Sequence, residues 1–93
     1  MKFNRDSATD KAKNDLAKRL NIKESEIKTE SVTERDFPNM SLGAPASGEM
    51  SAQMISTGWT INLSADGKNY EYRGDKYQLR LFDFKGANYV VEG

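Results

Sequence analysis

The chain of 93 residues contains no cysteine and no histidine. Without cysteine there is no disulfide framework, no thiol nucleophile and no thiolate ligand for zinc. Without histidine there is no imidazole ligand, no base for a Ser-His-Asp triad and no usual general base for hydrolysis. The acidic residues do not follow the spacing of a calcium-binding loop either. We therefore predict no catalytic residues, no metal site and no cofactor, and we expect that the protein is not an enzyme.

An excess of charge of either sign is also lacking, because 14 Lys and Arg residues balance 14 Asp and Glu residues. Nucleic-acid binding normally draws on surplus positive charge that displaces counterions, so we expect no nucleic-acid partner. No run of 18 apolar residues occurs, and the sequence thus predicts no membrane span. The first residues, Met1 to Asp6, lack the apolar segment of a signal peptide.

Length and composition favour one small domain that covers residues 1–93 and acts as a monomer. Apolar residues make up 37% and charged residues 30% of the chain, which suffices for one modest hydrophobic core. Residues 1–6 are polar apart from Met1 and Phe3, and we expect this terminal segment to be disordered.

The N-terminal part carries an apolar residue at every fourth position: Ala8, Ala12, Leu16 and Leu20. This period is typical of an amphipathic helix with one buried stripe, and it predicts a helix over about residues 8–20. Ser7 suits the N-cap position, and Asn21 suits the left-handed residue that ends many helices.

The remainder of the chain predicts strands. A β-branched segment near residues 26–36 indicates a first strand, and the clearest pattern runs from Gln53 to Leu63. In that pattern five side chains share one face: Ile55, Thr57, Trp59, Ile61 and Leu63. Gly58 inside the strand indicates a bulge or the close approach of another backbone.

Short turns follow, and they predict a meander. Asp66-Gly67 tolerates the positive φ of a tight hairpin turn. Further strands are expected over about residues 68–73, from Tyr77 to about Phe84, and over residues 89–91. The expected fold class is therefore α+β, with one N-terminal helix packed on an antiparallel sheet of about four to five strands, and with the meander in the C-terminal half.

Four aromatic residues have two interpretations: Trp59, Tyr70, Tyr72 and Tyr77. They form either a binding face for sugars or peptides, or part of the core. We favour the core, because a domain of this size has few other large apolar groups to bury. The tripeptide Arg73-Gly74-Asp75 matches an adhesion motif, but Gly-Asp is ordinary turn chemistry and we interpret it as a turn.

The segment 37–48 holds both prolines and two of the seven glycines, and it predicts a long, conformationally restricted loop. It is either a recognition loop or a plug that covers one end of the sheet with Phe37, Met40 and Leu42. For Leu42 itself we favour the plug. The candidate binding residues are Asn39, Ser41, Gly43, Pro45, Ala46, Ser47 and Gly48. Among these we expect four to be the exposed contacts: Asn39, Ser41, Ala46 and Ser47.

An ordered series of short motifs runs through about two-thirds of the chain. It comprises the helix Asp15-Leu16-Ala17-Lys18-Arg19-Leu20, the pair Phe37-Pro38, the loop Ser41-Leu42-Gly43-Ala44-Pro45-Ala46-Ser47-Gly48, Gln53 with Gly58-Trp59, and the hairpin Gly67-Lys68-Asn69-Tyr70-Glu71-Tyr72. In this series the chain resembles a family of small uncharacterised prokaryotic domains, many of them in exported proteins or lipoproteins. The family differs in having Trp in place of Phe37 and Cys in place of Ala44 in many members.

The resemblance implies an exported or surface-attached protein, and hence an extracytoplasmic location, but no mechanism. Cystatins are similar in overall plan, yet their Gln-x-Val-x-Gly motif fails here because Gln53 to Gly58 is one residue too long. Our leading hypothesis is a non-enzymatic module that binds a protein partner. The alternative is a small protease inhibitor that presents the 37–48 loop.

Overall fold

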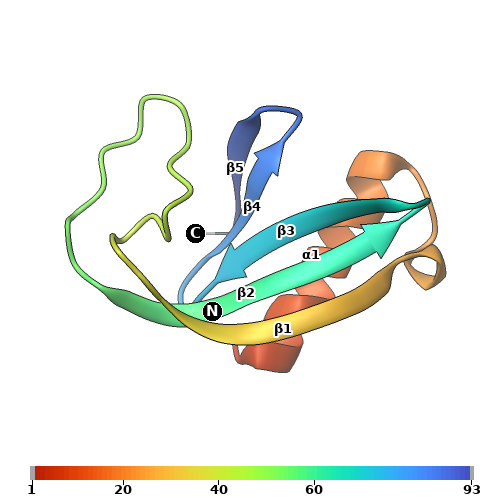
Figure 1. Ribbon diagram of the computed structural model, residues 1–93, viewed down its shortest axis with the longest axis horizontal. Helices are drawn as coiled ribbons and strands as arrows, with labels where there is room; N and C mark the ends of the chain where they lie inside the picture. Colours follow the sequence, from red (N-terminus) through yellow and green to blue (C-terminus); the bar gives the residue numbers. More distant parts are fainter. Residues whose placement is uncertain (1, 93) are drawn as a thin grey trace.

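The computed structural model describes residues 2–92, which form one helix, one short 3-10 turn and one five-stranded sheet (Figure 1). The helix is α1 (Arg5–Leu20), the turn is η1 (Glu24–Glu26), and the strands are β1 (Lys28–Phe37), β2 (Ser56–Ala65), β3 (Lys68–Gly74), β4 (Leu79–Phe84) and β5 (Ala87–Glu92). All neighbouring strands are antiparallel, and their order in the sheet is their order in the sequence. The predicted α+β class and the meander are confirmed.

The start of α1 differs from the prediction. Asn4 rather than Ser7 is the N-cap: its Oδ1 accepts from the Ser7 N–H at 2.8 Å, and its own N–H donates to Ser7 Oγ at 2.9 Å. The expected disorder of residues 1–6 is wrong for residues 2–6, while Met1 lies outside the described residues. Phe3 is the physical reason, because it is only 5% exposed and its N–H donates to the Lys76 carbonyl at 2.7 Å. At the other end Asn21 is left-handed, as predicted, with φ 55°.

The predicted helical stripe packs on one face of the sheet. Its buried residues are Ala8, Ala12, Leu16 and Ala17, and they contact a core that includes Ile61, Leu63, Tyr72, Leu79 and Leu81. The small alanine side chains allow the helix to lie close to the strands, and Figure 1 shows α1 along one face of β2 and β3.

One polar contact also ties α1 to the sheet. The Tyr72 hydroxyl donates to Asp15 Oδ2 at 2.7 Å, and Arg19 Nε donates to the same oxygen at 2.7 Å. Burial, reinforced by the hydrogen bond to the Asp15 carboxylate, raises the pKa of Tyr72 well above its usual value. The phenol therefore remains protonated as a donor.

The expectation that the aromatic residues build the core holds for three of the four. Tyr72 is fully buried, and Trp59 and Tyr70 are partly buried against the core. Tyr77 is 63% exposed, because β4 begins only at Leu79 and Tyr77 belongs to the preceding turn. Ile55 is likewise 74% exposed, since β2 begins one residue after it.

Two glycines meet where β2 begins and β3 ends. A Cβ atom added to Gly58 would lie 2.0 Å from the carbonyl oxygen of Gly74, so the predicted close backbone approach is confirmed. On either side of Gly74, Arg73 and Asp75 are 8% and 6% exposed. The Asp75 carboxylate accepts from the N–H groups of Tyr77 and Gln78 at 2.8 and 3.0 Å. The Arg-Gly-Asp tripeptide is thus buried, with Arg73 and Gly74 at the end of β3 and Asp75 at the start of the turn to β4.

Leu16 has no exposed surface and packs between α1 and the sheet. Truncation of such a side chain removes apolar burial and leaves a cavity, so we expect Leu16→Ala to lower the free energy of unfolding by about 2–5 kcal/mol. Urea denaturation followed by circular dichroism measures this loss. Asp10→Ala on the exposed side of α1 is the control and should change stability by less than about 0.5 kcal/mol. An equally small loss for Leu16→Ala would contradict the packing described.

Candidate functional site

Residues 38–55 connect β1 to β2 and contain every residue that the sequence singled out as a binding candidate. In Figure 1 this loop leaves the ends of β1 and β2 and folds back beside the β4–β5 hairpin. At that hairpin the Asn88 side chain donates to the Pro45 carbonyl at 3.0 Å. The loop is therefore held against the sheet although it contains no strand or helix of its own.

Two buried arginines anchor the loop. Arg73 and Arg80 are direct neighbours on β3 and β4, and they are 8% and 6% exposed. Because they alternate with core residues such as Tyr72, Leu79 and Leu81, they leave the sheet on the face opposite α1. Arg73 Nη1 donates to the carbonyl oxygens of Leu42 and Gly43 at 3.1 Å each, and Arg80 Nη1 donates to that of Ala44 at 3.1 Å.

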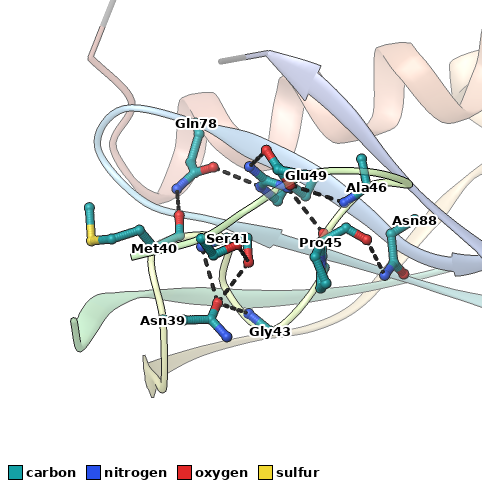
Figure 2. Close-up of polar contacts among 12 residues, drawn as sticks. Asn39, Met40, Ser41, Gly43, Pro45, Ala46, Glu49, Gln78 and Asn88 are labelled. Atoms are coloured by element: carbon teal, nitrogen blue, oxygen red, sulfur yellow. Dashed lines mark hydrogen bonds and ion pairs between the residues drawn. The ribbon is translucent and has the colours of Figure 1, made fainter. Parts of the chain in front are cut away.

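Arg80 also binds an acidic residue of the loop (Figure 2). Its Nη1 and Nη2 contact the two carboxylate oxygens of Glu49, with Nη2 to Oε2 at 2.7 Å. Glu49 Oε1 accepts the Ala46 N–H at 3.0 Å. The hydrogen bond from Arg80, followed by the one from Ala46, lowers the pKa of Glu49 to about 2.

Gln78 links this ion pair to Met40, near the start of the loop. Gln78 Oε1 accepts from Arg80 Nε at 2.7 Å, and its amide Nε2 donates to the Met40 carbonyl at 2.6 Å. Figure 2 shows these bonds running from Met40 through Gln78 to Glu49. Met40 is further fixed because its N–H donates to the Ala52 carbonyl at 2.9 Å.

The charge of the buried Arg73 guanidinium is also paired. Its Nε donates to Glu71 Oε2 at 2.6 Å, and its guanidinium lies 3.7 Å from the centre of the Phe82 ring. The Phe37 ring lies on another side, at 5.8 Å. A buried charge is costly unless it is paired and hydrogen-bonded, and here these contacts meet that condition.

A tight turn shapes the loop between these anchors. Asn39 Oδ1 accepts from the N–H and the hydroxyl of Ser41 at 3.1 and 2.8 Å, and from the Gly43 N–H at 3.1 Å. Leu42 and Gly43 both adopt left-handed backbone angles, with φ 57° and 66°. At Gly43 a Cβ atom would also lie 2.8 Å from Arg73 Nη1, which makes glycine necessary there for space as well as for angle.

The structure divides the predicted loop residues by exposure. Leu42, Phe37 and Ala44 have no exposed surface, so the plug interpretation of Leu42 is confirmed. Met40 is 39% exposed and lies at the edge of the plug rather than inside it. Ser41, expected to be an exposed contact, is only 1% exposed, because its hydroxyl lies between Asn39 and Ser51.

The other candidates lie nearer the surface. Asn39, Gly43 and Ala46 are half-buried, whereas Pro45, Ser47 and Gly48 are exposed. Asn39 and Gly43 direct polar groups into the turn described above, and the Ala46 N–H and the Pro45 carbonyl are engaged with Glu49 and Asn88. Most of the polar groups in the predicted site thus hold the loop itself.

A hollow of about 550 Å³ lies beside the loop, where β2 begins and the β3–β4 turn passes. Its apolar lining, here called the apolar hollow, consists of Met40, Met54, Ile55, Trp59 and Tyr77. Four of these side chains are well exposed, at 39% for Met40, 64% for Met54, 74% for Ile55 and 63% for Tyr77. Large apolar side chains thus gather around a concave surface.

Only Met40 of this group belonged to the loop that the sequence singled out. One available signal was the concentration of methionine, since three of the four methionines lie at positions 40, 50 and 54. Ile55 and Tyr77 were assigned to buried strand faces because the apolar alternation continues beyond the actual strand ends. Their exposure depends on where β2 and β4 begin, which the alternation alone does not reveal.

The two groups with clearly shifted pKa values, Glu49 and Tyr72, are both engaged in structural hydrogen bonds. Within residues 2–92, Asp and Glu side chains do not gather in a group of three that would hold a metal ion. In the same part of the chain, no helix has the length and apolar character needed to span a bilayer.

Fold and site together define a small α+β domain with a pinned loop and an exposed apolar recess. The family described as a domain of unknown function, DUF8738, matches residues 9–81, and the chain belongs to this family. The matched segment begins within α1, includes the whole loop and ends within β4. Comparisons with curated proteins and with solved structures found no match. Membership of an uncharacterised family agrees with the resemblance seen in the sequence.

Because Leu42 is fully buried beneath the loop, we expect Leu42→Ala to destabilise the protein by about 2–5 kcal/mol. Ser47→Ala, in the exposed part of the same loop, serves as the control and should be neutral. Chemical denaturation measures both. A loss below about 0.5 kcal/mol for Leu42→Ala would mean that the plug does not form in solution.

The contact between Arg80 and Glu49 should make stability depend on pH. The folded-state pKa of Glu49, about 2, is below its usual value of 4.5, so the contact stabilises the fold above about pH 4.5 and is lost as the pH falls through about 2. We expect Glu49→Gln to be less stable than wild type at pH 7, with a difference that shrinks between pH 4.5 and 2. Urea titrations across this pH range measure it, and a difference that stays constant would contradict the contact.

Proposed function

We propose that this protein is a non-enzymatic interaction module that binds a protein partner through the apolar hollow. The observation that carries the proposal is the grouping of exposed apolar side chains around one recess of about 550 Å³. Single exposed apolar residues are ordinary, whereas a concave cluster is typical of binding sites.

The lining has the two kinds of side chain that recognition of apolar groups requires. Met40 and Met54 are flexible and polarisable, so they adapt to the shape of a bound group. Trp59 and Tyr77 present rigid, large surfaces that bind at low entropic cost. A leucine, methionine or aromatic side chain of a partner would fit this combination.

The pinned loop supports the proposal because it keeps one wall of the hollow in place. Met40 lies next to the turn held by Asn39, and its carbonyl and N–H are bound by Gln78 and Ala52. A site that is already formed before binding loses less entropy when a partner arrives. In this proposal the loop residues predicted as contacts serve mainly as the frame.

A protease inhibitor that presents the 37–48 loop is the alternative function. Ser41, Leu42 and Ala44 are buried and out of reach of a protease cleft, whereas Pro45, Ser47 and Gly48 are exposed. Inhibition assays with a panel of serine, cysteine and metalloproteases distinguish this function from the leading one. Inhibition that is lost when residues 45–48 are changed, but not when the hollow is changed, would favour the alternative.

We further propose that the protein is exported or displayed at the cell surface, which the family resemblance supports. Fractionation of cells that produce the full-length native protein tests this location. Recovery of the protein in the cytoplasmic fraction alone would contradict it.

Selection from a displayed library of random peptides tests the apolar hollow directly. We expect wild type to enrich peptides with large apolar residues, and we expect Met54→Asp to weaken their binding by at least about tenfold, because a carboxylate would have to be desolvated against them. Titration of synthetic peptides by fluorescence anisotropy measures the loss. Met50→Asp is the matched control, because Met50 is 97% exposed but does not line the hollow. No enrichment, or equal loss in both variants, would contradict the proposed function.

A further inference from the structure

Among the described residues, the outer edge of β1 is not paired with another strand. β1 is hydrogen-bonded to β2 alone within the described sheet, so its other edge meets no strand. One contact shows which residues face that edge: Arg5 Nη2 donates to the Val32 carbonyl at 2.7 Å. In an antiparallel strand the N–H and C=O of one residue point to the same side, and alternate residues repeat the direction. Val32, Glu34 and Asp36 therefore present their backbone groups outward.

The side chains of the same three residues lie on the face that α1 covers. Val32, Glu34 and Asp36 pair with Ile61, Trp59 and Thr57 of β2, and Ile61 is buried in the core. Cross-strand partners share a face of the sheet. Glu34 also lines the hollow, so a single residue connects the open edge of β1 with the apolar hollow.

Two carboxylates lie along this part of β1, at Glu34 and Asp36. Glu34 and Asp36 are exposed, and neither takes part in the four ion pairs found among residues 2–92. The Thr57 hydroxyl donates to Asp36 at 2.8 Å, which leaves the charge of Asp36 in place. Two cations are near: Arg5 is engaged with the Val32 carbonyl, and Lys76 lies on the lining beside Tyr77. A basic side chain beside Glu34 and Asp36 would complement them.

We propose that the hollow is occupied by an extended segment of the partner that adds to the sheet at the outer edge of β1. The segment pairs its backbone with Glu34 and Asp36 and with the N–H of Val32, since the Val32 carbonyl is bound by Arg5. It places a Lys or Arg beside the two carboxylates and an apolar side chain, two residues away on the same face, in the hollow. This inference rests on the proposed function, since the same hollow receives the apolar group.

A second copy of the chain is a poorer occupant of this edge. If two β1 strands paired antiparallel along their outer edges around Glu34 and Arg35, Glu34 of one copy would lie opposite Glu34 or Asp36 of the other. Like charges directly opposite each other destabilise a strand pair, and charged edge strands are a common protection against self-association. The charge pattern thus selects a basic segment from a different chain.

The peptides enriched on wild type provide the probes. We expect them to carry Lys or Arg two residues from Leu, Met, Phe or Trp. Glu34→Lys should weaken their binding by at least about tenfold, and replacing the basic residue of the peptide by Glu should restore binding to that variant. Asp10→Lys on the exposed side of α1 is the control for added charge and should leave binding unchanged.

Backbone pairing is tested on the peptides themselves. N-methylation removes one N–H at a time, and we expect losses of at least about tenfold at alternate residues with little change at the residues between them. Peptides that depend on Met54 but show no basic preference and no alternating effect would overturn this inference and leave the proposed function intact. Failure to enrich any peptide that depends on Met54 would overturn both.

Discussion

The arrangement of the loop depends on two guanidinium groups that emerge from neighbouring strands on the face of the sheet opposite α1. Arg73 and Arg80 donate to three successive carbonyl groups of the loop, at Leu42, Gly43 and Ala44. Carbonyl groups buried without donors are costly, so these bonds are a condition for the loop to lie on the sheet at all. Truncating either arginine would also leave its carboxylate partner without a cation, and the loop would no longer be held in one conformation.

This dependence follows from how a five-stranded sheet is covered. Apolar side chains on one face meet α1, and the alternation of the strands sends Arg73 and Arg80 to the other face. There the chain supplies residues 38–55 as the cover instead of a second helix. Phe37 and Leu42 fill the space beneath that cover, and the arginines satisfy its backbone. The apolar hollow lies where this cover meets β2 and the β3–β4 turn, so exposed apolar side chains remain there.

The elements that could be predicted from the sequence rest on local periodicity. The stripe ending at Leu20, the Asp66-Gly67 turn and the close approach at Gly58 each depend on a few neighbouring residues. The features that were missed depend on contacts between distant residues. Phe3 orders the N-terminus through Lys76, and Glu49 joins Arg80 across 31 positions. Contacts between distant residues produce no periodic pattern in the sequence. The loop could therefore be recognised, but the arginines that anchor it could not.

The candidate site was only partly predictable for a related reason, which the turn at Leu42 illustrates. A left-handed backbone costs an ordinary residue about 1–2 kcal/mol, and the apolar side chain of Leu42 cannot form a local hydrogen bond that would offset this cost. Full burial of a leucine side chain contributes about 1.5–3 kcal/mol, so the turn is stable when the side chain is buried and not otherwise. The left-handed backbone at Leu42 and the burial of its side chain therefore depend on each other. Met40 lies next to that turn, so the turn positions it. The part of the apolar hollow that Met40 forms therefore depends on the burial of Leu42.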